Sequence, residues 1–145
     1  MSACHSVVSR NLPGPPRIDV NKVHAQIWRF LPTLDPQVEI LLSRDLDSRL
    51  SRREVAAVEE WLDSEAKVHV MRDAPCHEAS MLAGMWGARI EEESIRRLWA
   101  GTWDTMLEDK LAFASREIKG PDQDLLDKYV WPWARHIALT HDSYQ

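Results

Sequence analysis

The sequence is poor in cysteine, in long apolar runs and in excess positive charge. Its two cysteines, Cys4 and Cys76, are too few for a disulfide framework or a cysteine zinc site, and we expect both to be free thiols. No apolar run approaches the ~20 residues that span a bilayer. Residues 1–10 also lack the apolar stretch of a signal peptide. No membrane segment is therefore expected in this chain, and a cytoplasmic location is the default prediction.

Charge gives no sign of a nucleic-acid partner. The chain carries 18 Lys and Arg residues against 23 Asp and Glu residues, a net charge of -5, and its arginines are scattered. Affinity for phosphate backbones needs clustered basic residues, so DNA and RNA are not expected to bind.

What the sequence does contain is enough material for one folded domain. With 145 residues, of which 44% are hydrophobic, the chain can bury a core without disulfides. Residues 1–19 include Pro13-Gly14-Pro15-Pro16 and are expected to form a flexible tail. Residues 20–145 are expected to form a single α/β domain.

Apolar spacing in the first half of this domain predicts helix, strand, helix, strand. Residues 20–31 favour a short amphipathic helix that ends before Pro32, and residues 38–42 favour a buried strand. After the next helix, residues 67–71 are expected to form a second strand. This order predicts a parallel sheet with a right-handed crossover.

The helix between these two strands has the most complete start signal. Ser51-Arg52-Arg53-Glu54 fits a capping box, in which Ser51 covers early amides and Glu54 reaches back. Its apolar face is expected to consist of Val55, Val58, Trp61 and Leu62.

The second half predicts a loop and two helices. Residues 81–87 are apolar and contain glycines, and we expect a loop that could approach a ligand closely. Residues 91–109 have the spacing of a long helix. Another helix is expected to begin at Pro121 and to be interrupted by Pro132.

Asp45 and Asp47 are the first candidates for chemistry, because they follow the first expected strand. Two carboxylates on one loop suit Mg²⁺ or Mn²⁺, although the same spacing is common in ordinary turns. Arg44 and Arg49 flank the pair, where they could form ion pairs or meet a substrate phosphate, and the ion pairs are favoured.

The other candidates are weaker by position alone. Asp122-Gln123 lies at the expected start of a helix, where an acid is favoured for structural reasons alone. The histidines are too dispersed for a zinc site. Of the tryptophans, Trp86 and Trp131 are the better candidates for a pocket, whereas the core is expected to take Trp61, Trp99 and Trp103.

Several of these motifs together resemble a group of GT-A-type glycosyltransferases. The similarity covers residues 27–144, and both order and spacing agree. It is carried by residues 43–49, Arg53-Glu54, Ala57-Val58, Trp61-Leu62, residues 69–73, residues 84–87, Asp122-Gln123, Val130-Trp131-Pro132 and residues 141–144. Ala74 and Ala83 depart from that pattern, which favours histidine and glycine there.

The resemblance implies a partial GT-A-like (Rossmann-like) three-layer α/β domain, with a small sheet flanked by helices and an incomplete N-terminal side. It implies transfer of a sugar from a nucleotide-sugar donor to a glycan or other hydroxyl acceptor. Mn²⁺ or Mg²⁺ would be held by Asp45 and Asp47, and Asp122 would act as the general base. The implied donor and acceptor pocket consists of Arg44, Arg49, Arg72, Asp73, Gly84, Trp86 and Gln123.

Two other functions stay open. The chain could be a catalytically inactive or truncated relative of such a transferase that only binds a ligand or partner. It could also be a haloacid-dehalogenase-type phosphatase with Asp45 as nucleophile and Asp47 as acid/base, which Ser48 fits loosely and Arg49 does not. An exposed apolar face at the incomplete side would point to an oligomer or a fragment.

Overall fold

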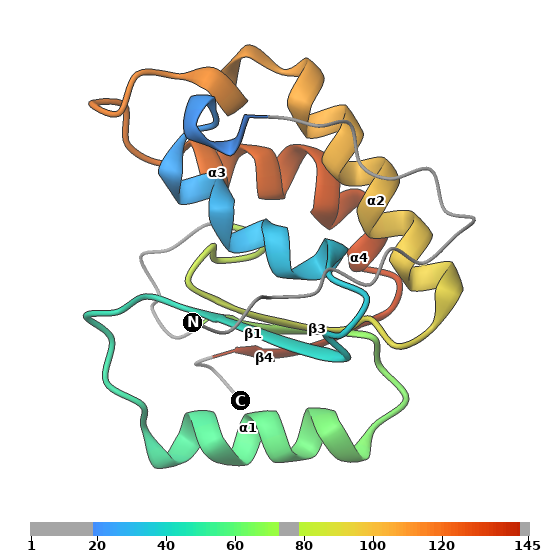
Figure 1. Ribbon diagram of the computed structural model, residues 1–145. Coiled ribbons are helices and arrows are strands. Elements are labelled where there is room, and N and C mark those ends of the chain that lie inside the picture. Colours follow the sequence, from blue (N-terminus) through green and yellow to red (C-terminus); the bar gives the residue numbers. More distant parts are fainter. Residues whose placement is uncertain (1–18, 73–78, 143–145) are drawn as a thin grey trace, which may run out of the picture.

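The computed structural model describes residues 19–72 and 79–142, which form a four-stranded sheet with helices on both faces (Figure 1). The expected tail lies outside this part of the chain, apart from Asp19. The elements are, in chain order, η1 (Val20–Lys22), η2 (Ala25–Leu34), β1 (Ile40–Arg44), α1 (Arg52–Asp63), β2 (Val68–Arg72), β3 (Met85–Arg89), α2 (Glu93–Glu108), η3 (Lys110–Phe113), α3 (Pro121–Leu125), η4 (Leu126–Val130), α4 (Trp131–Ala134) and β4 (Ala138–Asp142).

The helices form two layers with the sheet between them. Helix α1 alone covers one face, while η2, α2, α3 and α4 lie on the opposite face (Figure 1). The expected α/β class is thus confirmed.

The sheet is mixed, with strand order β1-β3-β2-β4, and not parallel as the sequence predicted. Strands β1 and β2 do run in the same direction around α1. However, β3 lies between them and pairs antiparallel with both, while β4 pairs parallel with the other edge of β2. The expected strand–helix–strand unit therefore exists, but its two strands are separated by a strand that comes later in the chain.

Strand β3 occupies the place where the sequence predicted a loop. Trp86, Ala88 and Ile90 alternate along and beyond it and are fully buried. Gly87 lies between them, where a Cβ would come within 2.8 Å of Leu42 Cδ2 and 3.2 Å of the Trp61 ring. The glycine is needed because side chains from β1 and α1 fill the space beside it.

The start of α1 is as predicted, whereas its buried face agrees with the prediction only in part. Ser51 Oγ accepts a hydrogen bond of 3.1 Å from the backbone N–H of Glu54, which confirms the N-cap. Glu54 does not reach back; its carboxylate pairs with Arg44 of β1. The buried residues of α1 are Glu54, Ala57 and Trp61, so Trp61 is buried as predicted, whereas Val55 and Leu62 are exposed.

The N-terminal helix differs from the expected one in type and in length. It consists of 3₁₀ turns, and η2 continues through Pro32 to Leu34. Proline has no N–H to donate, but its carbonyl accepts from Asp35 N at 3.2 Å and closes the last turn. The amphipathic character expected for this stretch is present, since Ile27 and Phe30 are buried and Trp28 is exposed.

The later helices begin as expected, and the second passes beyond its proline. Helix α2 occupies most of the predicted range, and Pro121 begins α3. Before Pro132 the chain widens into the π turn η4, where Trp131 N bonds to Leu126 O, and then continues as α4. The wider turn accommodates Pro132, so the predicted interruption does not occur.

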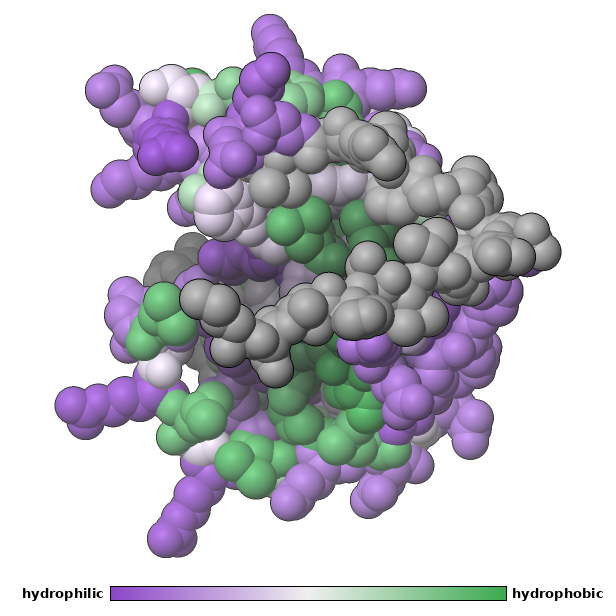
Figure 2. Space-filling view, viewed as in Figure 1, coloured by the Kyte–Doolittle hydropathy of each residue, from purple (hydrophilic) through white to green (hydrophobic). Residues whose placement is uncertain are grey.

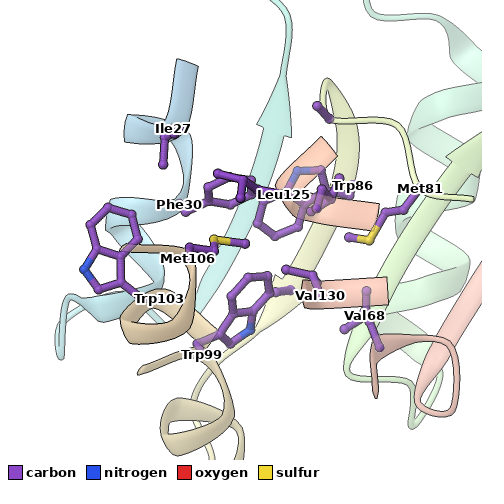
Figure 3. Packing of buried hydrophobic residues seen from close by; sticks show 14 of the residues in the cluster. Ile27, Phe30, Val68, Met81, Trp86, Trp99, Trp103, Met106, Leu125 and Val130 are labelled. Atoms are coloured by element: carbon purple, nitrogen blue, oxygen red, sulfur yellow. The ribbon is translucent and has the colours of Figure 1, made fainter. Parts of the chain in front are cut away.

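Trp86 is part of the core and not of a pocket. Its side chain is 0% exposed and stacks between Phe30 and Trp99, with ring centroids 5.9 and 5.2 Å away (Figure 3). Trp99 and Trp103 are buried as predicted. The pocket role expected for Trp86 is therefore replaced by packing between the sheet and the helices.

One edge of the sheet leaves apolar side chains in solvent. Figure 2 shows hydrophobic side chains gathered in the lower half of the view, where β1 and α1 lie. The exposed large hydrophobic residues of this region are Ile40, Leu42, Leu46, Leu50, Val55 and Leu62. An exposed apolar face of the kind the sequence raised thus lies beside β1. Within the described ranges, no helix is both long enough and apolar enough to cross a bilayer.

Candidate functional site

Asp45 and Asp122 are 77 positions apart in the sequence, and both bind the same guanidinium group. Arg29 Nη2 lies 3.2 Å from Asp45 Oδ1, and Arg29 Nε lies 3.1 Å from Asp122 Oδ2. The Asp45 side chain is 48% exposed and that of Asp122 only 5% exposed. We call these three residues the acid–arginine cluster.

Three elements of the fold bring this cluster together. Asp45 directly follows β1, Asp122 lies in the first turn of α3, and Arg29 lies on η2, which contacts both. Ile27 and Phe30 are buried on either side of Arg29 along the chain, and they fix η2 against the core. The guanidinium is thereby directed to the end of β1.

Gly84 makes room for the Asp45 carboxylate. A Cβ at this position would lie 2.2 Å from Asp45 Oδ2, far inside van der Waals contact. The glycine that the sequence placed in a ligand pocket thus lies directly against the candidate metal ligand. Any larger residue there would displace the carboxylate.

The segment that carries Gly84 is held from both sides. Ser43 Oγ donates to Ala83 O at 3.0 Å. Gln123 Oε1 accepts from Ala83 N at 2.9 Å, and its Nε2 donates to Met81 O at 2.7 Å. Gln123, another predicted pocket residue, therefore positions the backbone beside Asp45.

Asp47 lies on the turn that follows β1. Ser48 N donates to Asp45 O at 3.2 Å across this turn, and Asp47 is exposed. In the described ranges, no group of three His, Cys, Asp or Glu side chains has a metal-binding arrangement. Mg²⁺ and Mn²⁺, however, commonly use one or two carboxylates together with substrate phosphates and water. Asp45 and Asp47 are two exposed carboxylates of this kind on one turn, and cation binding by them stays a prediction.

The other predicted site residues lie elsewhere or serve the fold. Arg44 pairs with Glu54 and donates to the carbonyls of Ser43 and Trp86. Arg72 Nε lies 2.7 Å from Asp142 Oδ1 on β4. Arg49 is exposed before α1, and Asp73 lies outside the described residues. The ion pair favoured for Arg44 is present, but its partner is on α1.

A second polar group lies under α1. His69 is fully buried, and its Nε2 lies 3.1 Å from His141 Nδ1, whose Nε2 is 3.2 Å from Glu60 Oε2. The Trp61 ring stacks on His69 with centroids 5.4 Å apart. Burial, and to a smaller extent the nearby His141 and Arg44, lowers the pKa of His69 to about 4. This pairing could not be predicted from the sequence, because the two histidines are 72 positions apart in the chain.

Arg29 is the residue of the acid–arginine cluster that the sequence did not point to. It lies outside the acidic motif, in a stretch for which the apolar spacing predicts only a packing helix. Its position between Ile27 and Phe30 indicates a place near the edge of the core. No residue close to Arg29 in the sequence indicates that Asp45 and Asp122 are its partners.

The chain matches no protein-family model, no curated protein and no solved structure. The family resemblance therefore rests on the motifs alone, and the function has to be proposed from the site.

Proposed function

We propose that the chain binds a nucleotide-sugar donor through a divalent cation at Asp45 and Asp47 and transfers the sugar to an acceptor hydroxyl. The observation that carries this proposal is the placement of Asp45 at the end of β1, against Gly84 and beside Arg29. Ligands of α/β sheets commonly bind at strand ends. An exposed carboxylate and an arginine at one strand end suit a cation and a diphosphate together.

Each residue of the site has a task in this proposal. Asp45 and Asp47 hold the cation, which when bound would neutralise charge on the leaving diphosphate. Gly84 leaves space for the carboxylate, and Gln123 holds the backbone that carries Gly84. The task of general base stays a prediction for Asp122, whose carboxylate is bound to Arg29 Nε in the structure.

Binding, and not turnover, is the sharper test. Uridine and guanosine diphosphates would be titrated calorimetrically with Mn²⁺ into the wild type and into Asp45→Ala and Asp47→Ala variants. Asp104→Ala is the matched control, since Asp104 is exposed on α2, in another part of the fold. We expect Mn²⁺-dependent binding in the wild type and control and its loss in both site variants, each shown to be folded by circular dichroism.

Two outcomes would redirect the proposal. No nucleotide binding by the wild type would favour the inactive binding domain, for which the Arg29–Asp45 ion pair is the supporting observation, since it satisfies Asp45 without a cation. Hydrolysis of p-nitrophenyl phosphate with Mg²⁺, lost in Asp45→Ala, would instead favour the phosphatase.

A further inference from the structure

Arg29 uses only part of its hydrogen-bonding capacity. Its Nε and Nη2 bind Asp122 and Asp45, whereas its Nη1 is buried and has no hydrogen-bond partner among residues 19–72 and 79–142. A buried donor without a partner is unfavourable, because it has lost its hydrogen bonds to water and gained none in return. A ligand acceptor at this place would therefore be stabilised.

The two partners of Arg29 are held with different firmness. Asp122 is almost fully buried, so its bond to Nε is shielded from water, whereas Asp45 is half exposed. Exposed ion pairs contribute little to stability. Asp45 is thus the partner that Arg29 can give up, and Asp122 is the one that anchors it.

We propose that Arg29 exchanges Asp45 for a phosphate of the ligand when a divalent cation binds Asp45. This inference rests on the proposed function and names the residue that recognises its diphosphate. With Asp45 on the cation, Nη1 and Nη2 are both without a protein partner, and together they form the planar fork that binds two phosphate oxygens. Asp122 holds the guanidinium by Nε in this state and is its positioning residue.

The exchange predicts effects of opposite sign for two ligands. In Arg29→Gln, Mn²⁺ alone has no guanidinium to displace from Asp45, so its affinity is expected to rise several-fold. Inorganic pyrophosphate, titrated at saturating Mn²⁺, is expected to bind roughly 10- to 100-fold more weakly, because a charge-assisted hydrogen bond is lost. A variant that merely damages the fold would lower both affinities.

Two further variants keep the test decisive if Arg29→Gln folds poorly. Arg29→Lys retains the positive charge but not the fork, so Mn²⁺ affinity should stay near that of the wild type while pyrophosphate affinity falls. Asp122→Asn releases the anchor and should weaken pyrophosphate without weakening Mn²⁺. Arg97→Gln, an exposed arginine on α2, is the control and should change neither.

The outcomes separate this inference from the proposed function. All variants would be titrated calorimetrically with Mn²⁺, with pyrophosphate and with nucleoside diphosphates. The inference is supported if Arg29→Gln raises the affinity for Mn²⁺ and lowers the affinity for pyrophosphate. Equal pyrophosphate affinity in wild type and Arg29→Gln, or parallel loss of both ligands in every Arg29 variant, overturns it. A wild type that binds pyrophosphate but no nucleoside diphosphate refutes the proposed function alone, and one that binds neither Mn²⁺ nor pyrophosphate refutes both.

Discussion

Between pH 6.5 and pH 4 the free energy of unfolding is expected to fall, and replacing His69 by glutamine should abolish much of this fall. His69 is fully buried on β2, and the titratable and charged groups that act on it come from three elements of the fold. They are His141 on β4, Arg44 on β1, and Glu60 on α1, which acts through His141. Glutamine retains a polar group toward His141 but does not titrate in this range.

The direction follows from proton uptake in the two states. The unfolded chain protonates this imidazole near pH 6.5, whereas the folded protein does so only near its lowered pKa of about 4. Between these values the unfolded chain binds more protons, so the free energy of unfolding falls as the pH falls. The two pKa values correspond to a loss of at most about 3 kcal/mol. Above pH 6.5 His69 is neutral in both states and contributes no pH dependence.

Urea unfolding followed by tryptophan fluorescence, at pH values on both sides of 6.5, measures this loss. The absolute stability of His69→Gln will also change, so the readout is the slope of the unfolding free energy against pH. His136→Gln is the control, since His136 is exposed. If the wild type and His69→Gln give parallel curves, burial of His69 is not the source of the acid sensitivity and the reasoning fails.

Three other substitutions test the packing. Gly101→Ala in α2 should raise the free energy of unfolding by about 0.5–1 kcal/mol in urea titrations, because a Cβ there meets nothing within 4 Å. Gly84→Ala should instead destabilise by about 1–3 kcal/mol and weaken Mn²⁺ binding in calorimetry, because its Cβ collides with Asp45. Glu54→Ala removes the carboxylate that pairs with the Arg44 guanidinium and should lower the unfolding free energy by about 3–5 kcal/mol in the same titrations. If the double variant with Arg44→Met loses as much unfolding free energy as Glu54→Ala alone, this explanation is refuted.

Features of the fold that depend on residues close together in the sequence could be predicted. The N-cap at Ser51 depends on one hydroxyl and one amide three positions later, and the structure contains that hydrogen bond. The start of α3 at Pro121 and the core positions of Trp99 and Trp103 depend equally on local geometry and spacing. Such features need no knowledge of distant segments.

Features that depend on distant partners could not be predicted. Glu54 does not complete the predicted capping box, because its carboxylate pairs with Arg44, ten positions earlier in the chain. Gly84 and Gly87 predict a loop where the structure has strand β3. Both glycines are required by side chains of other elements, namely Asp45, Leu42 and Trp61. The alternation of Trp86, Ala88 and Ile90 was the signal that could have revealed the strand.

The position of Arg29 explains why the charge of the candidate site can be changed by substitution without loss of the core packing of η2. The flanking residues Ile27 and Phe30 provide the core contacts of η2, while the Arg29 side chain points to Asp45 and Asp122. Substitution of Arg29 therefore removes charge from the site without opening a cavity in the core. The opposite ligand responses expected for Arg29 variants thus report the chemistry at the end of β1, and the apolar anchors of η2 remain in place to keep the strand end intact.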